Sequence, residues 1–252
     1  MNLKKILIPL VAISIFLVFW ETLVWMNGWP NYKMASPSDL IPAYLKYWKL
    51  FFIMGWQTLW RTIVGLLISV IVGISLGMLM GLNKTTREAL YPLLVGFNAI
   101  PKATVVPIVA LLFVGAHDMN TILIAFMISF FPIAVSISIG LSTLEPEYSD
   151  ILRSLGASRT TIFWKIALPK TLPEFFGALK VSVSLAFIGT NLMEIVSPHG
   201  RGLGSLFDSG KTNSDYPLMF AVLIALAVLG ILLYYAVIAL ELIFADWAEK
   251  DE

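Results

Sequence analysis

Asp150-Ile-Leu-Arg-Ser-Leu-Gly156, followed by a polar turn and by Ile166-Ala-Leu-Pro169, is the stretch around which the rest of the chain is organised. It lies near the middle of a sequence made otherwise of long apolar runs, and it carries several basic residues: Arg153, Arg159, Lys165 and Lys170. Charged groups are costly inside the hydrocarbon of a bilayer. We therefore predict that residues 145–170 are a water-exposed segment between membrane helices, two short helical pieces hinged at Gly156.

The composition of the whole chain places it in a membrane. Of its 252 residues, 58% are hydrophobic and 13% are charged, and the mean hydropathy is +0.85. So little polar surface cannot coat a soluble globule. The net charge of +1 argues against nucleic-acid binding, which needs a concentrated basic patch. With no Cys and two distant His residues, His117 and His199, we expect no catalytic site, metal or cofactor in this chain.

The N-terminal residues 1–35 are interpreted as an uncleaved first membrane helix and its outer connector. A signal peptide is the alternative, but no small-residue cleavage site follows the apolar run. Residues 36–55 open with Ser-Pro-Ser-Asp, which is typical of a helix start. Their apolar residues recur at helical spacing, and this predicts an amphipathic helix in the outer interface or a simple connector.

Residues 56–245 form the core of the chain. They contain five apolar segments long enough to cross the hydrocarbon, given about 1.5 Å of rise per residue: 63–82, 89–116, 119–141, 172–196 and 216–240. The sequence therefore predicts an all-α membrane protein of about six transmembrane helices, with both termini on one side and residues 246–252 as a tail.

Small residues recur every four positions in the span 63–82: Gly65, Ser69, Gly73, Gly77 and Gly81. A helix face with almost no side chain lets another backbone approach closely. We therefore expect this face to pack against a second helix, and a contact with solute is the alternative.

The span 89–116 is interrupted by several helix-disturbing or charged residues: Pro92, Pro101, Lys102 and Pro107. Such breaks persist in membranes where protein or a water-filled cavity satisfies the freed backbone groups. We therefore expect this span to line a pathway, with Asn98 and Lys102 facing it. For Lys102, snorkelling to an interface is the alternative.

Two further pathway candidates, Asn191 and Glu194, lie in the span 172–196. A carboxylate at membrane depth is expensive unless it is paired or hydrated. The alternative for Glu194 is a structural role, paired with a basic group or placed at the outer rim. Gly200, Gly202 and Gly204, which follow this span, are interpreted as a flexible turn.

Basic residues in the loops indicate the orientation, because cytoplasmic loops carry more of them. One side receives Lys4, Lys5, Lys84, Arg87, Arg153, Arg159, Lys165, Lys170 and Lys250, and the other receives Lys33, Lys46, Lys49, Arg201 and Lys211. Arg61, Lys102 and Lys180 are left out as membrane-embedded or ambiguous. This excess predicts that residues 145–170 and both termini are cytoplasmic.

The central segment resembles the signature of the permease subunits of binding-protein-dependent ABC importers. That signature reads Glu-Ala-Ala, three residues, Gly, nine residues, Ile, one residue, Leu-Pro. In this chain Asp150-Ile-Leu152 takes the place of Glu-Ala-Ala. Gly156, Ile166 and Leu168-Pro169 then occur at the spacing of the signature. Other stretches resemble the sulfonate, nitrate and taurine branch: Ser36-Pro-Ser38, Ile100–Pro107, Phe130–Ile133, Arg153–Ser158 and Gly202–Gly204. The resemblance covers residues 36–245.

The resemblance implies the type I ABC importer permease fold in the bacterial inner (cytoplasmic) membrane. It implies a homodimer of this chain, two cytoplasmic ATPase subunits that bind ATP and Mg²⁺, and an extracytoplasmic solute-binding protein. Segment 145–170 would be the coupling helix, with these contacts to the ATPase: Asp150, Ile151, Leu152, Arg153, Leu155, Gly156, Ala157, Ile166, Leu168 and Pro169. Asp150 replaces the Glu of the signature, and Ile-Leu replaces its two alanines. The detailed contacts with the ATPase are therefore left open.

The solute implied is a sulfonate, nitrate, taurine or a vitamin precursor, and nothing in the spans selects among them. A secondary transporter driven by an ion gradient is the alternative, although such carriers usually contain internal repeats and embedded acidic sites. A membrane-embedded enzyme and a scaffold that moves no solute are further alternatives.

Overall fold

The computed structural model describes residues 3–142, 154, 156, 158, 161, 163–197 and 200–245. Regular structure in these residues is helical throughout, so the predicted all-α class is confirmed. The elements are α1 (Leu3–Asn27), α2 (Pro37–Leu82), α3 (Lys84–Ala99), α4 (Lys102–Leu112), α5 (His117–Ser142), a π-helical turn (Phe163–Ala167), α8 (Leu168–Val196), α9 (Leu203–Thr212) and α10 (Tyr216–Phe244).

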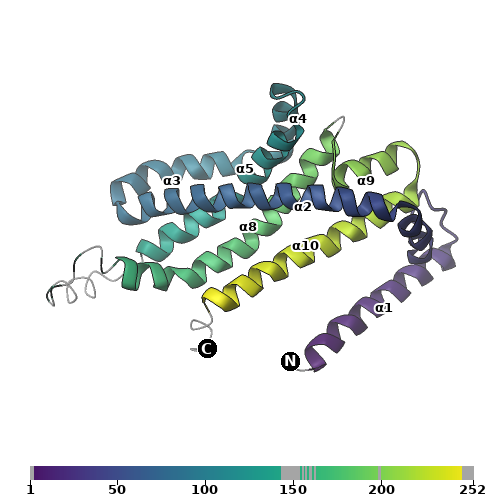
Figure 1. Cartoon of the computed structure of the whole chain (residues 1–252), viewed down its shortest axis with the longest axis horizontal. Helices are drawn as coiled ribbons and strands as arrows, with labels where there is room; N and C mark the ends of the chain where they lie inside the picture. Colours follow the sequence, from purple (N-terminus) through teal and green to yellow (C-terminus); the bar gives the residue numbers. More distant parts are fainter. Residues whose placement is uncertain are drawn as a thin grey trace.

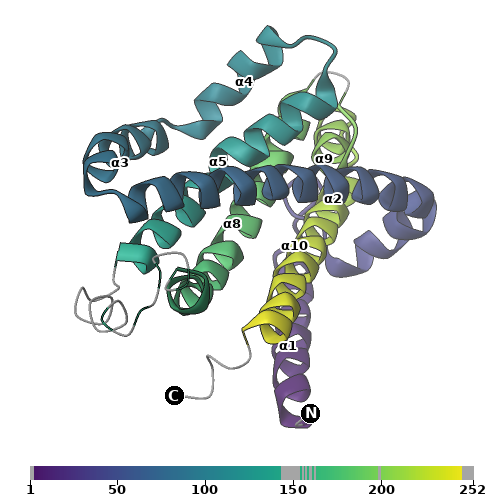
Figure 2. The ribbon, with the colours of Figure 1, turned by 60° about the vertical axis from the view of Figure 1, so that its left-hand side comes forward.

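Among the described residues, four helices are long and apolar enough to cross a membrane: α2, α5, α8 with its π-helical turn, and α10. The pair α3 and α4 makes a fifth span, bent by 85°. These are four or five of the about six spans expected, and α1 is a further apolar helix, whose apolar part, Val11–Asn27, is shorter. Helix α1 begins and α10 ends on the same side of the molecule (Figures 1 and 2).

We call the side where α5 ends and α8 begins the coupling end, because these helices flank residues 143–162. The opposite side, where α5 begins and α8 ends, is called the far end. Figure 1 shows α2, α5, α8 and α10 running between the two ends. Helix α9 lies at the far end, between α8 and α10.

Helix α2 begins where Ser-Pro-Ser-Asp predicts a helix start. The backbone N–H and the hydroxyl of Ser36 donate to Asp39 Oδ2, at 3.1 and 2.7 Å. Residues 37–55 are continuous with the following span in one helix of 46 residues. Its one interior residue with non-helical backbone angles is Tyr47 (φ −111°, ψ 15°). The expected amphipathic helix and first core span are therefore joined, and the kink lies at Tyr47.

The expected close packing of the glycine face is confirmed, and its partner is α5. A Cβ at Gly77 would lie 2.6 Å from the Cβ of Ile137, and one at Gly65 would lie 2.6 Å from the Cβ of Ala125. Between them, the Ser69 and Ser129 hydroxyls are 2.6 Å apart. Van der Waals contact and hydrogen bonds therefore hold these helices together, since lipid gives apolar side chains no incentive to associate.

Helix α8 also packs closely against α5. A Cβ at Gly189 would lie 3.0 Å from the Cα of Ala125, and one at Gly140 would lie 2.6 Å from the side chain of Thr171. A buried apolar cluster then joins α5 and α8 to α10: Ile133, Ile137, Leu141, Ala167, Phe176, Leu179, Val183, Leu233, Val237 and Ala245. Helices α2, α5 and α8 thus form one closely packed core.

The expected break in the third span is confirmed at Ile100 and Pro101. Ile100 has extended backbone angles (φ −63°, ψ 126°), as expected before a proline, whose ring disfavours the helical conformation. Helices α3 and α4 continue through Pro92 and Pro107 respectively. Figure 2 shows α4 turned away from α3 at this break.

Candidate functional site

The predicted coupling residues fall into two groups. Six lie outside the described residues: Asp150, Ile151, Leu152, Arg153, Leu155 and Ala157. Gly156 is described, and its φ is +85°, a conformation that glycine adopts freely and other residues adopt at a cost. The predicted hinge position therefore has a backbone conformation that favours glycine.

The rest of the signature leads directly into a membrane helix. Ile166 lies in the π-helical turn Phe163–Ala167, and Leu168-Pro169 opens α8. Ala167, between them, is 2% exposed and belongs to the buried cluster that joins α5, α8 and α10. Proline is well tolerated in the first turn of a helix, where its missing N–H has no helical partner. The end of the signature is thus anchored in the core of the bundle.

Glu194 lies near the other end of α8 and is buried, with 1% of its surface exposed. Its carboxylate accepts the Thr58 hydroxyl at 2.8 Å, the backbone N–H of Gly204 at 3.0 Å and Nη1 of Arg61 at 3.2 Å. A buried carboxylate needs such partners because it has lost its hydration. Glu194 is therefore paired with a basic group, which was its alternative role.

Arg61 connects Glu194 to a second acid. Its Nε and Nη2 lie 2.8 and 2.6 Å from Oδ1 of Asp118, at the start of α5. Its Nη1 also donates to the backbone carbonyl of Arg201. We call Thr58, Arg61, Asp118 and Glu194 the far-end cluster. One cation in this cluster faces two carboxylates, one buried and one 58% exposed.

The glycines after α8 are closely packed around this cluster, which differs from the expected flexible turn. Gly202 is buried, its φ is +134°, and a Cβ there would overlap the Glu194 carboxylate. A Cβ at Gly204 would lie 2.7 Å from the Cβ of Glu194. Helix α9 starts within this turn, in a region expected to be a loop. Glycine is thus required because a buried side chain fills the space that a Cβ would take.

The other pathway candidates lie apart from this cluster. Lys102 bridges the break between α3 and α4: its Nζ donates to the carbonyl of Phe97 at 2.5 Å and lies 4.7 Å from that ring's centre. It thereby satisfies a carbonyl near the C-terminus of α3. Asn98 is exposed on α3. Asn191 donates to the carbonyl of Phe187, one turn earlier in α8, at 2.7 Å.

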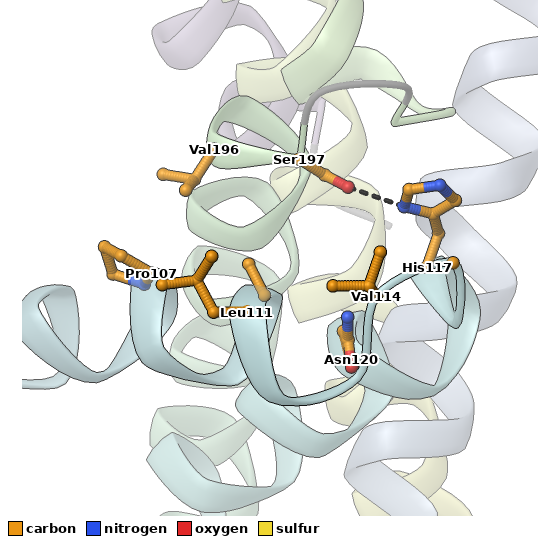
Figure 3. A pocket seen from close by; sticks show the side chains of 9 residues that line it. Pro107, Leu111, Val114, His117, Asn120, Val196 and Ser197 are labelled. Atoms are coloured by element: carbon orange, nitrogen blue, oxygen red, sulfur yellow. Dashed lines mark hydrogen bonds between the residues drawn. The ribbon is translucent and has the colours of Figure 1, made fainter.

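Two of the hollows lined by described residues lie at the far end. One, of about 500 Å³, lies between α4, α5 and α8, and its lining is apolar apart from groups such as His117, Asn120 and Ser197. Figure 3 shows His117 and Ser197 facing each other across its rim, with His117 Nδ1 and Ser197 Oγ 2.7 Å apart. The second, of about 540 Å³, has a lining that is about half polar and includes Asp118 and Arg201.

The structure therefore brings Glu194 together with residues that sequence reasoning missed: Thr58, Arg61 and Asp118. Thr58, Arg61 and Thr62 share one face of α2, at spacings of three and four residues. Polar residues at helical spacing just before an apolar span could have indicated a polar site on this face of the helix. Within the described parts of the chain, no group of His, Asp and Glu is placed to hold a metal ion.

Comparison with known proteins identifies the class. Residues 69–247 match the family model described as "binding-protein-dependent transport system inner membrane component". The chain is 33% identical to the formylaminopyrimidine transport permease ThiX of Halalkalibacterium halodurans, over 96% of each chain. It is 33% identical to the riboflavin permease RibX of Chloroflexus aurantiacus, over 94% of this chain and 88% of the relative. The taurine permease TauC of Escherichia coli is 25% identical, over 97% and 90%.

A solved structure shares the fold. A chain of the MetNI methionine ABC transporter, in an inward-facing conformation, superimposes with a TM-score of 0.63. The match covers 75% of this chain and 94% of that chain, at 20% identity. The arrangement of helices described above is therefore that of a type I importer permease, as the resemblance implied.

Proposed function

The chain belongs to the binding-protein-dependent transport system inner membrane components, and from this membership we propose that it forms the solute pathway of an ABC importer driven by a separate ATPase subunit. The chain is a permease subunit of an inner-membrane ABC importer. The ATPase partner, the binding protein and the solute are parts of the proposal. The observation that carries it is the family match over residues 69–247.

The coupling segment is proposed to be residues 145–170, which dock into the ATPase subunits. Support comes from the described end of the signature. Gly156 has a φ of +85°, and the chain passes from Ile166 through the buried Ala167 into α8. A force applied at Ile166 would therefore reach α8 without an intervening loop. Coupling is then a shift between two arrangements of packed helices.

The proposed assembly contains two copies of this chain, two cytoplasmic ATPase subunits and an extracytoplasmic binding protein. ATP and Mg²⁺ are held by the ATPase subunits. Both termini and the coupling end face the cytoplasm, as the loop charges predict. The far-end cluster and the turn Gly200–Gly204 then lie towards the outside.

For the solute we propose an uncharged heterocycle of the vitamin-precursor kind. The relatives that carry formylaminopyrimidine and riboflavin are 33% identical to this chain, and the taurine permease is 25% identical. The hollow between α4, α5 and α8 supports this class, because its described lining is mostly apolar and has no Lys or Arg. Ligand sites with few, well-placed polar groups suit such molecules.

Co-purification tests the proposed partnership. The tagged chain, expressed together with an ABC ATPase subunit from the same organism, is expected to retain that subunit through affinity purification. Gly156→Ala should weaken this association, because the φ of +85° costs about 1–2 kcal/mol for a residue with a Cβ. Gly115→Ala is the matched control, since Gly115 has a φ of +84° and open space around it at the far end.

The proposal fails if no ATPase subunit is retained by the wild-type chain, or if Gly115→Ala weakens retention as much as Gly156→Ala. Uptake into reconstituted vesicles that contain an ion gradient but no ATP would favour a secondary transporter. ATP-driven uptake of formylaminopyrimidine that excess taurine does not inhibit would support the vitamin-precursor class. Uptake of taurine that formylaminopyrimidine does not inhibit would contradict it.

A further inference from the structure

Arg61 of α2 joins four parts of the chain at one buried point. Its guanidinium contacts Asp118 of α5 and Glu194 of α8, and it donates to the carbonyl of Arg201 in the turn before α9. The side chain of Arg61 is 3% exposed. A planar, permanently charged group with several donors can hold these acceptors in fixed directions, whereas a lysine ammonium is a single point of charge.

Helix α8 connects this point to the coupling segment. It runs from Leu168 to Val196, 29 residues, which corresponds to about 43 Å. Its one interior proline, Pro173, lies near the coupling end. Gly140 of α5 meets α8 at Thr171, and Gly189 of α8 meets α5 at Ala125. Closely packed helices transmit displacement because their interfaces do not deform continuously.

Glu194 has hydrogen-bond donors other than Arg61, so neutralising the buried charge of Glu194 is not the only role of Arg61. The carboxylate also accepts the Thr58 hydroxyl and the N–H of Gly204. The shortest contact of Arg61 in the cluster's ion pairs is with Asp118, whose carboxylate is 58% exposed and has little need of a buried partner. The arrangement therefore links elements to one another in addition to neutralising Glu194.

We propose that Arg61 is a positioning residue for transport, which ties the far end of α8 to α2, α5 and the turn before α9. A displacement that starts at the coupling segment then moves these elements together. Without this tie, the ATPase subunits continue to hydrolyse ATP, but the far end no longer responds. The inference rests on the proposed function, because it needs a force that arrives at the coupling end.

A labelling experiment separates this role from a purely structural one. The chain contains no Cys, so Leu206→Cys places a single thiol on α9 at a position that is 5% exposed. The complex with its ATPase subunit is placed in nanodiscs, and a membrane-impermeant maleimide reports exposure of this thiol with and without Mg-ATP. With Arg61 present, ATP is expected to speed labelling at least about fivefold.

Two variants test the tie in this background: Arg61→Lys, which keeps the charge, and Asp118→Asn, which changes a largely exposed group. Both are expected to keep ATP hydrolysis and to lose the response of labelling to ATP. Asp118→Glu should restore the response. The controls are Lys49→Gln, an exposed cation on the same helix, and Asp208→Asn, an acid on α9 outside the cluster.

The inference is overturned if both variants respond to ATP as the wild type does, or if hydrolysis and response fall in parallel. Should Arg61→Lys fail to fold, Asp118→Asn with its Glu rescue decides the question. A wild-type chain that binds no ATPase subunit, or a complex that hydrolyses no ATP, contradicts the proposed function and this inference together. A normal wild-type response with unaffected variants contradicts only the inference.

Discussion

Lys180 of α8 and Glu241 of α10 form an ion pair in the half of the bundle nearer the coupling end, with Nζ and Oε2 2.5 Å apart. Their side chains are 26% and 14% exposed. Lys180 lies about 20 Å along α8 from Glu194. Helix α8 is thus held to α10 by one ion pair and to α2 by another, and each sits towards a different end.

The first prediction concerns this ion pair. Lys180→Met leaves the Glu241 carboxylate without its cation and should lower the free energy of unfolding by about 2 kcal/mol. This is less than the roughly 3–5 kcal/mol seen for fully buried pairs, because water reaches part of both groups. Thermal unfolding in detergent measures the effect. Lys180→Met combined with Glu241→Leu should recover most of the loss; a single variant as stable as the wild type would show that the pair contributes nothing.

The second prediction concerns the glycine face of α2. Gly77→Ala places a Cβ 2.6 Å from the Cβ of Ile137 and 2.8 Å from the carbonyl oxygen of Ala134. Separating α2 from α5 to make room should cost about 1–3 kcal/mol, as for other overpacked interiors. Gly96→Ala is the matched control, because Gly96 lies in α3 with nothing within 4 Å of the added atom. It should be neutral or stabilising by up to about 1 kcal/mol. Equal thermal stability of the two variants would contradict the described packing.

The third prediction concerns Thr58, which is fully buried. Its hydroxyl donates to Glu194 and accepts the backbone N–H of Leu203 at 2.8 Å. Thr58→Val keeps the shape but leaves the N–H of Leu203 unpaired and removes one of the donors to Glu194, and should cost about 1–3 kcal/mol. Thr58→Ser keeps the hydroxyl and should cost less. Unfolding monitored by tryptophan fluorescence compares them, and a valine variant more stable than the serine variant would contradict this role.

Much of the fold follows from local sequence. The four-residue repeat from Gly65 to Gly81 predicts a helix face made for close packing, and α5 occupies it. Pro101 predicts the break in the third span, because it lacks a backbone N–H and restricts Ile100. The Ser-Pro-Ser-Asp stretch predicts the start of α2. These features depend on neighbours in sequence, so the sequence alone is sufficient to find them.

The far-end cluster was only partly predictable. The cost of a buried carboxylate singled out Glu194, and a basic partner was one of its expected roles. The identity of that partner was not accessible, because Arg61 lies 133 residues earlier in the chain. The expectation that Gly200–Gly204 form a flexible turn was wrong for Gly202 and Gly204, which are buried against Glu194. Glycine permits both a free turn and a close approach, and composition does not distinguish them.

The sequence by itself determined that this chain is a bundle of membrane helices with a polar signature between two of them, because hydropathy, glycine spacing and proline act within single helices. Only the tertiary structure decided that Arg61, Asp118 and Glu194 meet at the end of α8 opposite the signature. The physical reason is that ion pairs depend on distance in space, and α2, α5 and α8 reach this arrangement only when all three are packed together.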